Sequence, residues 1–198
     1  MERTGVRFLR MKGCILVLSC MLLSTRGVSA AERGKIGIGV DVAYLDPQIS
    51  SLMYNQVSTT ISLSSEFSLR LPLTYVIGNS ETDVTMLGGG VALDYQPFAI
   101  PLFVSLSMVH CGYLFGSDAP LERLQYLDEF SLGYRWHPKK GKFFIEPSIT
   151  FFDPSGVYST EYEALKESFQ KFPDIRLSVL IGYEFFSFPL QKEVITTR

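Results

Sequence analysis

The residue types that most often perform chemistry are scarce in this chain, which holds two histidines and three cysteines among 198 residues. A serine nucleophile needs a histidine and an acid within reach. His110 stands beside Cys111, with Ser107 three positions before it, and His137 precedes Pro138. Neither histidine forms a recognisable nucleophile motif, and the spacing matches no metal-ligand set. We therefore expect no enzyme, no metal and no cofactor, and we interpret His110 as an interfacial aromatic residue.

A second group of reactive side chains consists of charges that alternate with apolar residues. Its eight members are Asp41, Arg70, Asp94, Glu129, Arg135, Glu146, Arg176 and Glu184. Five acids and three arginines on one inward face should form ion pairs, because an unpaired buried charge is costly. Antiparallel registration places five of them in the same half of that interior: Arg70, Asp94, Arg135, Glu146 and Glu184. We predict a plug of salt bridges; the open alternative is an ion or proton path through it.

The elements that position these charges are predicted strands, because apolar residues recur at every second position. Eight segments follow this period: 36–44, 57–64, 67–75, 87–96, 102–109, 129–136, 143–151 and 175–185. Their connections alternate in length. The short ones lie near 64–66, 97–101 and 137–142, and the longer ones at 45–56, 77–83, 116–123 and 153–173. Short turns at one end and long loops at the other are typical of a transmembrane barrel.

The two faces of these strands favour a membrane barrel over a soluble sandwich or a lipocalin-like barrel. The polar face is mostly Ser, Thr and Gly with hardly any Lys, whereas a solvated sheet face mixes Lys and Glu. The apolar face ends in the aromatics that suit bilayer interfaces: Tyr44, Tyr75, Tyr95, Tyr134, Trp136, Phe151, Tyr183 and Phe185. We predict an all-β fold, an eight-stranded antiparallel up-and-down transmembrane β-barrel of outer-membrane type. Pro72 and Pro147 each then need a bulge or a lost ladder bond.

The composition and the first thirty residues fit an exported protein. No apolar run reaches the ~20 residues of a membrane-spanning helix, and the formal charge of −2 gives no nucleic-acid signature. A basic start, an apolar run over 14–23 and the small residues before Ala30 match a signal peptide. Cleavage after Ala30 leaves a chain of formal charge −6 with Cys111 as its one cysteine; lipidation at Cys20 is the competing interpretation. The predicted parts are the signal peptide 1–30, the barrel 31–186 and a tail 187–198, which is flexible or pairs with the first strand.

The last long loop carries its own helical pattern. Thr160 to Glu163 reads as a capping box, and four apolar residues then recur at helical spacing: Tyr162, Leu165, Phe169 and Phe172. We predict a short amphipathic helix in the last extracellular loop. Its apolar stripe either folds over the barrel mouth or lies in the lipid interface or against a partner.

The predicted strands within residues 35–186, and the last of them with its aromatic end Gly182-Tyr183-Glu184-Phe185, are similar to those of a known class. The chain resembles the small outer-membrane barrels of the OmpW/OprG or OmpX/Opa type. The resemblance implies integration into the outer membrane by the barrel-assembly machinery. In the OmpW/OprG direction it implies a narrow transporter of small, apolar solutes. In the OmpX/Opa direction it implies a surface adhesin that contacts a host molecule through loops 45–56 and 153–173.

The transport hypothesis places an apolar entrance at the mouth, formed by Leu52, Met53, Leu114, Phe115 and Leu121. Because the plug blocks straight passage, the solute would leave sideways between strands into the lipid. A purely structural role is a third possibility. We expect a monomer whose partner is outer-membrane lipid, with no nucleic acid.

Overall fold

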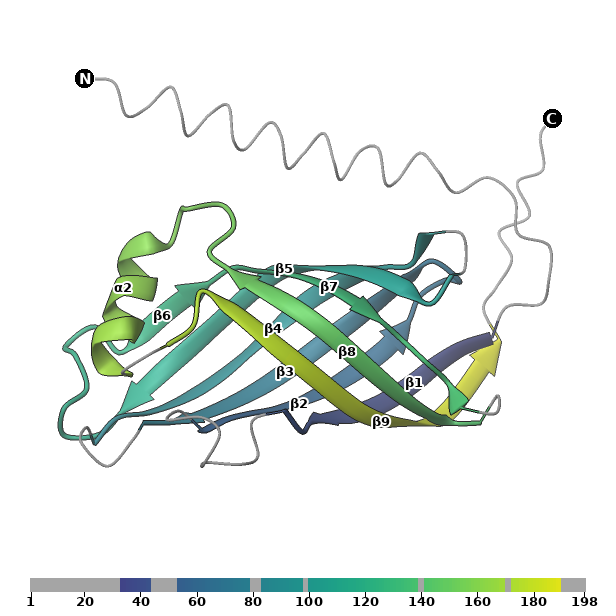
Figure 1. Ribbon diagram of the computed structural model, residues 1–198, viewed down its shortest axis with the longest axis horizontal. Coiled ribbons are helices and arrows are strands. Elements are labelled where there is room, and N and C mark those ends of the chain that lie inside the picture. The colour runs from purple at the N-terminus through teal and green to yellow at the C-terminus, as the bar shows by residue number, and fades with distance from the viewer. Residues whose placement is uncertain are drawn as a thin grey trace, which may run out of the picture. The chain divides into compact units, whose positions relative to one another are not determined.

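The chain folds into strands that tilt around a common axis (Figure 1). The computed structural model describes residues 33–43, 53–78, 83–97, 100–138, 141–169 and 172–189. The strands are β1 (Arg33–Asp41), β2 (Met53–Ser62), β3 (Phe67–Ile77), β4 (Thr85–Tyr95), β5 (Leu102–Phe115), β6 (Leu124–Leu127), β7 (Glu129–Tyr134), β8 (Phe143–Phe152) and β9 (Ile175–Pro189), and the helix is α2 (Ser159–Ser168). The predicted signal peptide and Cys20 lie outside the described residues.

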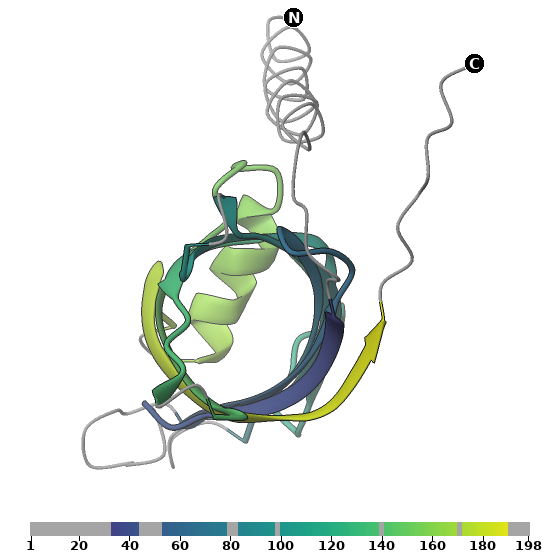
Figure 2. The same ribbon diagram turned by 90° about the vertical axis from the view of Figure 1, so that its right-hand side faces the viewer.

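The sheet is a closed, antiparallel, up-and-down barrel, as predicted. Strands that follow one another along the chain pair, with the exception of β6 and β7, and the pairing of β1 with β9 closes the ring. β6 and β7 both pair with β5, so together they occupy the place of one interrupted strand. Counted in this way, the barrel is eight-stranded. The view along the barrel shows this ring, with α2 lying across its opening (Figure 2). We call this opening the helix end, and the opposite opening, where β1 begins and β9 ends, the terminal end.

A bulge in β5 reverses the predicted facing of His110. Pairing with β4 shifts between Val91↔Val109 and Ala92↔Ser107, which leaves Met108 as the extra residue. Met108 and Val109 are therefore both exposed on the outer wall, and the alternation changes phase beyond them. His110 consequently points into the lumen and is buried, so its interpretation as an interfacial residue was wrong.

Both prolines interrupt a ladder, because neither can donate a backbone hydrogen bond. The β3–β4 pairing runs from Arg70↔Ala92 to Leu73↔Gly89 and omits Pro72. The β7–β8 pairing stops at Gly133↔Ser148, one step before Pro147, and resumes only as a bridge between Trp136 and Ile145. Pro72 is buried on the lumen side, whereas Pro147 is exposed on the outer wall.

α2 closes the helix end with the apolar stripe predicted for it. Four of its residues or their neighbours are almost fully buried: Tyr162, Leu165, Phe169 and Phe172. They form one cluster with residues from six strands: Tyr54, Val76, Met86, Leu114, Leu127 and Phe152. The stripe therefore caps the mouth, which was the first of the two predicted placements.

The helix does not begin with the predicted capping box. Tyr158 is the N-cap and makes no side-chain capping bond, and Thr160 lies inside the first turn. The Asp153 carboxylate, at a residue of positive φ, instead accepts a hydrogen bond from the Tyr158 amide at 3.2 Å. A local turn therefore replaces the side-chain cap that the sequence motif predicts.

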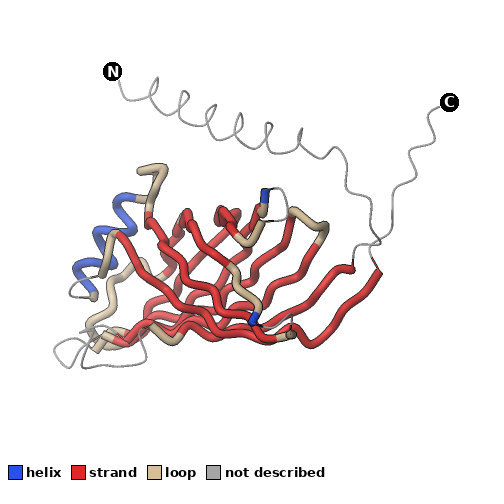
Figure 3. The backbone as a smooth tube through the Cα atoms, turned by 45° about the vertical axis from the view of Figure 1, so that its right-hand side comes forward, coloured by secondary structure: helices blue, strands red, loops and turns tan. Residues whose placement is uncertain are grey.

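At the terminal end, β1 and β9 continue beyond their other neighbours (Figures 1 and 3). β1 begins to pair with β2 at Ile36, whereas residues 33–35 pair with Ser187–Pro189. Strand pairing therefore continues past residue 186 to Pro189, so the first residues of the predicted tail pair with the first strand, which was one of the two alternatives predicted for the tail. Residues 190–198 lie outside the described part of the chain.

The outer wall is apolar along its whole height. No helix in the described part of the chain is long and apolar enough to cross a membrane. Large exposed hydrophobic residues lie on the strands instead, and the aromatics among them lie in two groups. The group at the helix end is Tyr75, Tyr113, Phe115 and Tyr126, and the group at the terminal end is Tyr134, Trp136, Phe143, Tyr183, Phe185 and Phe186. Aliphatic residues, among them Leu73, Leu132 and Ile181, occupy the wall between the two groups.

Candidate functional site: the closed lumen

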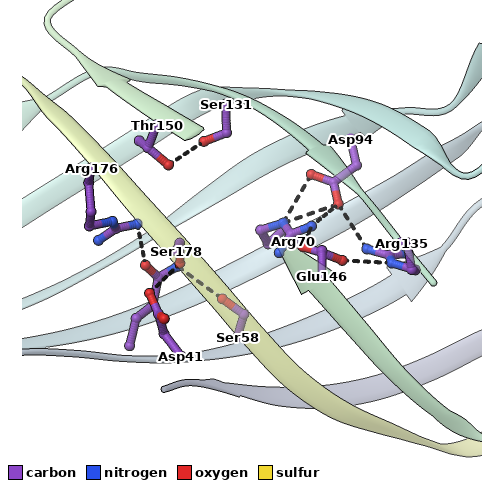
Figure 4. Close-up of polar contacts among 11 residues, drawn as sticks. Asp41, Ser58, Arg70, Asp94, Ser131, Arg135, Glu146, Thr150, Arg176 and Ser178 are labelled. Atoms are coloured by element: carbon purple, nitrogen blue, oxygen red, sulfur yellow. Dashed lines mark hydrogen bonds and ion pairs between the residues drawn. The ribbon is translucent and has the colours of Figure 1, made fainter. Parts of the chain in front are cut away.

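All eight predicted charges lie on the lumen side of the barrel. Six are buried: Asp41, Arg70, Asp94, Arg135, Glu146 and Arg176. The side chains of Glu129 and Glu184 are slightly more accessible. These eight residues form separate groups at different heights of the barrel. Figure 4 shows two of the groups.

Four of these residues form a compact cluster, which we call the plug: Arg70 (β3), Asp94 (β4), Arg135 (after β7) and Glu146 (β8). The Arg70 guanidinium donates to the Asp94 carboxylate at 2.7 Å and lies 2.6 Å from Glu146. Arg135 donates to Glu146 at 2.7 Å and reaches Asp94 at 3.4 Å. Two cations and two anions alternate, so the cluster is neutral and each carboxylate contacts both guanidinium groups. This arrangement meets the condition for burying charges in a low-dielectric interior.

Aromatic rings flank the plug. The Phe103 ring centroid lies 5.1 Å from the Arg70 guanidinium carbon and 5.7 Å from that of Arg135. The Phe144 ring lies 5.5 Å from Arg135. These distances are within the range of cation–π attraction. An eight-stranded barrel is just wide enough for side chains to fill, and here ion pairs and rings together fill its cross-section.

A second polar group surrounds Arg176, nearer the helix end. Arg176 donates to Gln56 at 2.6 Å and stacks on Tyr54, with 4.1 Å between the guanidinium carbon and the ring centroid. The Asp41 carboxylate accepts hydrogen bonds from the Ser178 hydroxyl and the Val179 amide. Nε and Nη1 of Arg176 have no hydrogen-bond partner among the described residues, although both are buried. Such donors need water or another ligand beside them.

The remaining acids pair with histidines. His110 Nδ1 lies 2.9 Å from a Glu129 carboxylate oxygen inside the barrel. Glu184 lies at the terminal end, where Lys35 is at 2.8 Å and His137 at 2.9 Å. Glu184 therefore belongs to a rim group and not to the plug.

Between the plug and the Arg176 group lies a polar cavity of about 40 Å³. Hydroxyl groups contribute much of its lining: Ser105, Ser107, Ser131, Ser148, Thr150 and Ser178. A buried water needs about 10–15 Å³ by this measure and two to four polar partners. The cavity therefore has room for a few waters, which would satisfy the free donors of Arg176.

The structure does not form the predicted apolar entrance. Leu114 is buried beneath α2, Phe115 faces outward, and Leu121 is fully exposed on the β5–β6 loop. Met53 begins β2, which shortens the predicted loop 45–56, and Leu52 lies outside the described residues. The bulge in β5 and the α2 cap separate residues that the alternation had placed at one mouth.

An apolar groove of about 730 Å³ lies against the wall formed by β5, β7, β8 and β9. Its lining includes Leu102, Leu132, Tyr134, Pro147, Ile149 and Leu177. Three further lining residues, Phe103, Ser148 and Ser178, also line the polar cavity of the lumen. The groove and the cavity thus approach one another at the point where Pro147 interrupts the β7–β8 ladder.

Outside the strands, hydrogen bonds connect neighbouring loops at the helix end. The Ser117 amide and hydroxyl donate to the Asp83 carboxylate at 3.2 and 3.0 Å, and these bonds lower the pKa of that carboxyl. The Tyr162 hydroxyl donates to the Asp128 carbonyl at 2.8 Å. Burial, followed by nearby negative charge, raises the pKa of Tyr162, so the phenol stays neutral and keeps this bond.

Several residues of the lumen are not predictable from the alternation alone. The sequence pattern assigns Gln56 to a loop and treats Phe103 only as a member of an alternating pair. It does not assign His110 to the lumen, because a bulge leaves no reliable mark in a single sequence. Phe103 could have been identified as unusual, because it is a large aromatic residue on an inward face that otherwise holds mostly Ser and Thr.

Comparison of the chain with family models, with curated proteins and with solved structures finds no match.

Proposed function

We propose that this protein is an outer-membrane β-barrel that transfers small apolar solutes between its lumen and the surrounding lipid. Two features support membrane insertion. Seven of the described strands have nine or more residues, and β6 and β7 together span 124–134, which is the length needed to cross a bilayer at a tilt. The exposed aromatics form two groups separated by aliphatic wall. Apolar surfaces of this extent mark sites of contact with a membrane or with another protein.

The observation that carries the transport proposal is the wall beside Pro147, which separates the lumen cavity from the outer groove. Straight passage is obstructed at two heights, by the α2 cap and by the plug. Sideways movement meets less resistance, because the β7–β8 ladder is interrupted and an apolar groove lies beside the lumen cavity there. The apolar lining of the groove favours an apolar solute.

Adhesion through loops 45–56 and 153–173 is the alternative hypothesis. The apolar residues of α2 are used in the cap, which leaves exposed polar residues such as Glu163, Lys166 and Glu167 on that loop. The described part of loop 153–173 therefore shows no specific partner surface, and residues 45–52 of the other loop lie outside the described part of the chain. The groove favours transport.

The two prolines provide a matched test in vesicles that carry residues 31–198. Replacing Pro147 by Val restores an amide at the interruption, so the β7–β8 ladder can close and uptake of a small apolar probe should fall several-fold. Pro72→Val restores an amide between β3 and β4, at a residue that lines the lumen cavity but not the groove; it leaves the β7–β8 ladder interrupted and should leave uptake unchanged. Equal uptake by wild type and Pro147→Val, or an equal fall in both variants, would contradict a passage beside Pro147.

A further inference from the structure

Phe103 occupies the boundary between the lumen cavity and the outer groove. Three residues line both spaces, and the other two, Ser148 and Ser178, are small. The Phe103 side chain is almost fully buried, at 3% exposure. One aromatic ring is thus the bulk of the barrier between a polar chamber and an apolar groove.

The neighbouring strand leaves room for this ring. Phe103 pairs across the ladder with Gly133. A Cβ atom at position 133 would lie 2.3 Å from the Phe103 ring, so a side chain there would displace the ring from this position. The ring therefore lies over the backbone of Gly133, next to the point where the β7–β8 pairing ends.

The plug holds the ring on the lumen side. The guanidinium groups of Arg70 and Arg135 lie 5.1 and 5.7 Å from its centroid, and both are fixed by carboxylates. Cation–π attraction to two immobilised cations favours the closed position of the ring. The same ion pairs that obstruct straight passage therefore also restrain Phe103.

We propose that Phe103 is the gate residue of the sideways passage: its ring separates the lumen cavity from the membrane-facing groove, and Arg70 and Arg135 keep it closed. The gate admits apolar molecules from the lipid side and excludes charged ones, because the groove beyond it is apolar. This inference rests on the transport function proposed above. It is tested separately, by access to the lumen and not by flux.

A thiol introduced into the lumen reports that access. Ser105→Cys places a thiol in the cavity, two residues from Phe103 on the same face of β5, and position 105 does not line the groove. The protein is residues 31–198, in which Cys111→Ser removes the one native thiol. The protein in lipid vesicles is then treated with N-cyclohexylmaleimide, an apolar reagent, or with a charged, membrane-impermeant methanethiosulfonate.

With Phe103 present, we expect the thiol introduced by Ser105→Cys to react slowly with both reagents. With Phe103→Ala, the apolar maleimide should react at least tenfold faster, whereas the rate with the charged reagent should not change. Phe144→Ala is the matched control, because Phe144 is equally buried and also stacks on Arg135 but lines neither space. It should leave the maleimide rate unchanged, because Phe144 does not border the groove.

An unchanged maleimide rate in Phe103→Ala would overturn the proposal, and so would an equal rise in Phe144→Ala or with the charged reagent. Circular dichroism checks the fold, and if Phe103→Ala does not fold, Phe103→Leu carries the same expectation with a smaller rise. If the maleimide rate rises in Phe103→Ala but the protein shows no solute uptake, the result would support the gate and refute the transport function. The two failures are therefore distinguishable.

Discussion

At the scale of the residue, Glu146 shows how charge is accommodated inside the barrel. Its two carboxylate oxygens contact Arg70 at 2.6 Å and Arg135 at 2.7 Å, and the side chain is about 1% exposed. Removing one member of a buried ion pair leaves an uncompensated charge, which costs more than the pair itself contributes. The plug should therefore be sensitive to any single neutralisation.

Glu146→Gln tests this sensitivity. The variant leaves two guanidinium groups with one carboxylate, and we expect the free energy of unfolding to fall by about 3–5 kcal/mol. Urea unfolding in lipid vesicles measures the change. Glu163→Gln, on the exposed face of α2, is the control and should change stability by less than about 0.5 kcal/mol. A loss below about 1 kcal/mol in Glu146→Gln, well under the cost of an unpaired buried charge, would show that the plug does not stabilise the barrel.

At the scale of the element, α2 acts as a cap because its apolar stripe fills the mouth of the barrel. Leu165 is fully buried among strand residues and Phe169, while the other face of the helix is exposed. An element that is carried on a loop can open locally without unfolding the whole protein. The stability of the cap should therefore depend on the stripe and not on the helix surface.

Leu165→Ala removes buried methyl groups from this cap, and comparable core substitutions cost about 2–5 kcal/mol. We expect amide hydrogen exchange in 159–168 to accelerate by at least tenfold while exchange in the barrel strands stays as it is. Glu163→Ala is the control on the same helix. Unchanged exchange in α2 after Leu165→Ala would show that the stripe does not hold the helix in the mouth.

The strands and the helix could be predicted from sequence because each carries its own period. Residues such as Leu69, Leu71 and Leu73 alternate on one face whatever the rest of the fold does. The bulge at Met108 and the start of α2 could not be predicted, because each depends on which segment lies alongside. The pairing of residues 187–189 with the first strand was one of two alternatives that the sequence left open. The plug followed from alternation plus register, whereas the placement of Phe103 depends on Gly133 and Pro147 across two ladders.

At the scale of the whole molecule, the proposed function requires a barrel whose outside meets lipid and whose inside is closed. The two aromatic groups and the aliphatic wall between them suit a bilayer. The cap, the Arg176 group and the plug close the lumen at successive heights, and the cavity of about 40 Å³ lies between the Arg176 group and the plug. An open polar pore is not expected from this arrangement.

The chain holds a single tryptophan, and it lies on this outer wall, which permits one direct measurement. Trp136 is 51% exposed and belongs to the aromatic group at the terminal end. Tryptophan in such a position should contact lipid near the headgroups. Its fluorescence therefore reports whether the wall lies in a bilayer.

Residues 31–198 would be reconstituted into vesicles containing lipids brominated at defined depths along the acyl chains. Trp136 fluorescence would be compared with that in unbrominated vesicles and in the presence of aqueous iodide. A barrel inserted in the membrane predicts strong quenching by bromines close to the headgroups, weaker quenching by deep bromines and little quenching by iodide. Efficient quenching by iodide with none by any brominated lipid would contradict membrane insertion and would make the protein a soluble barrel.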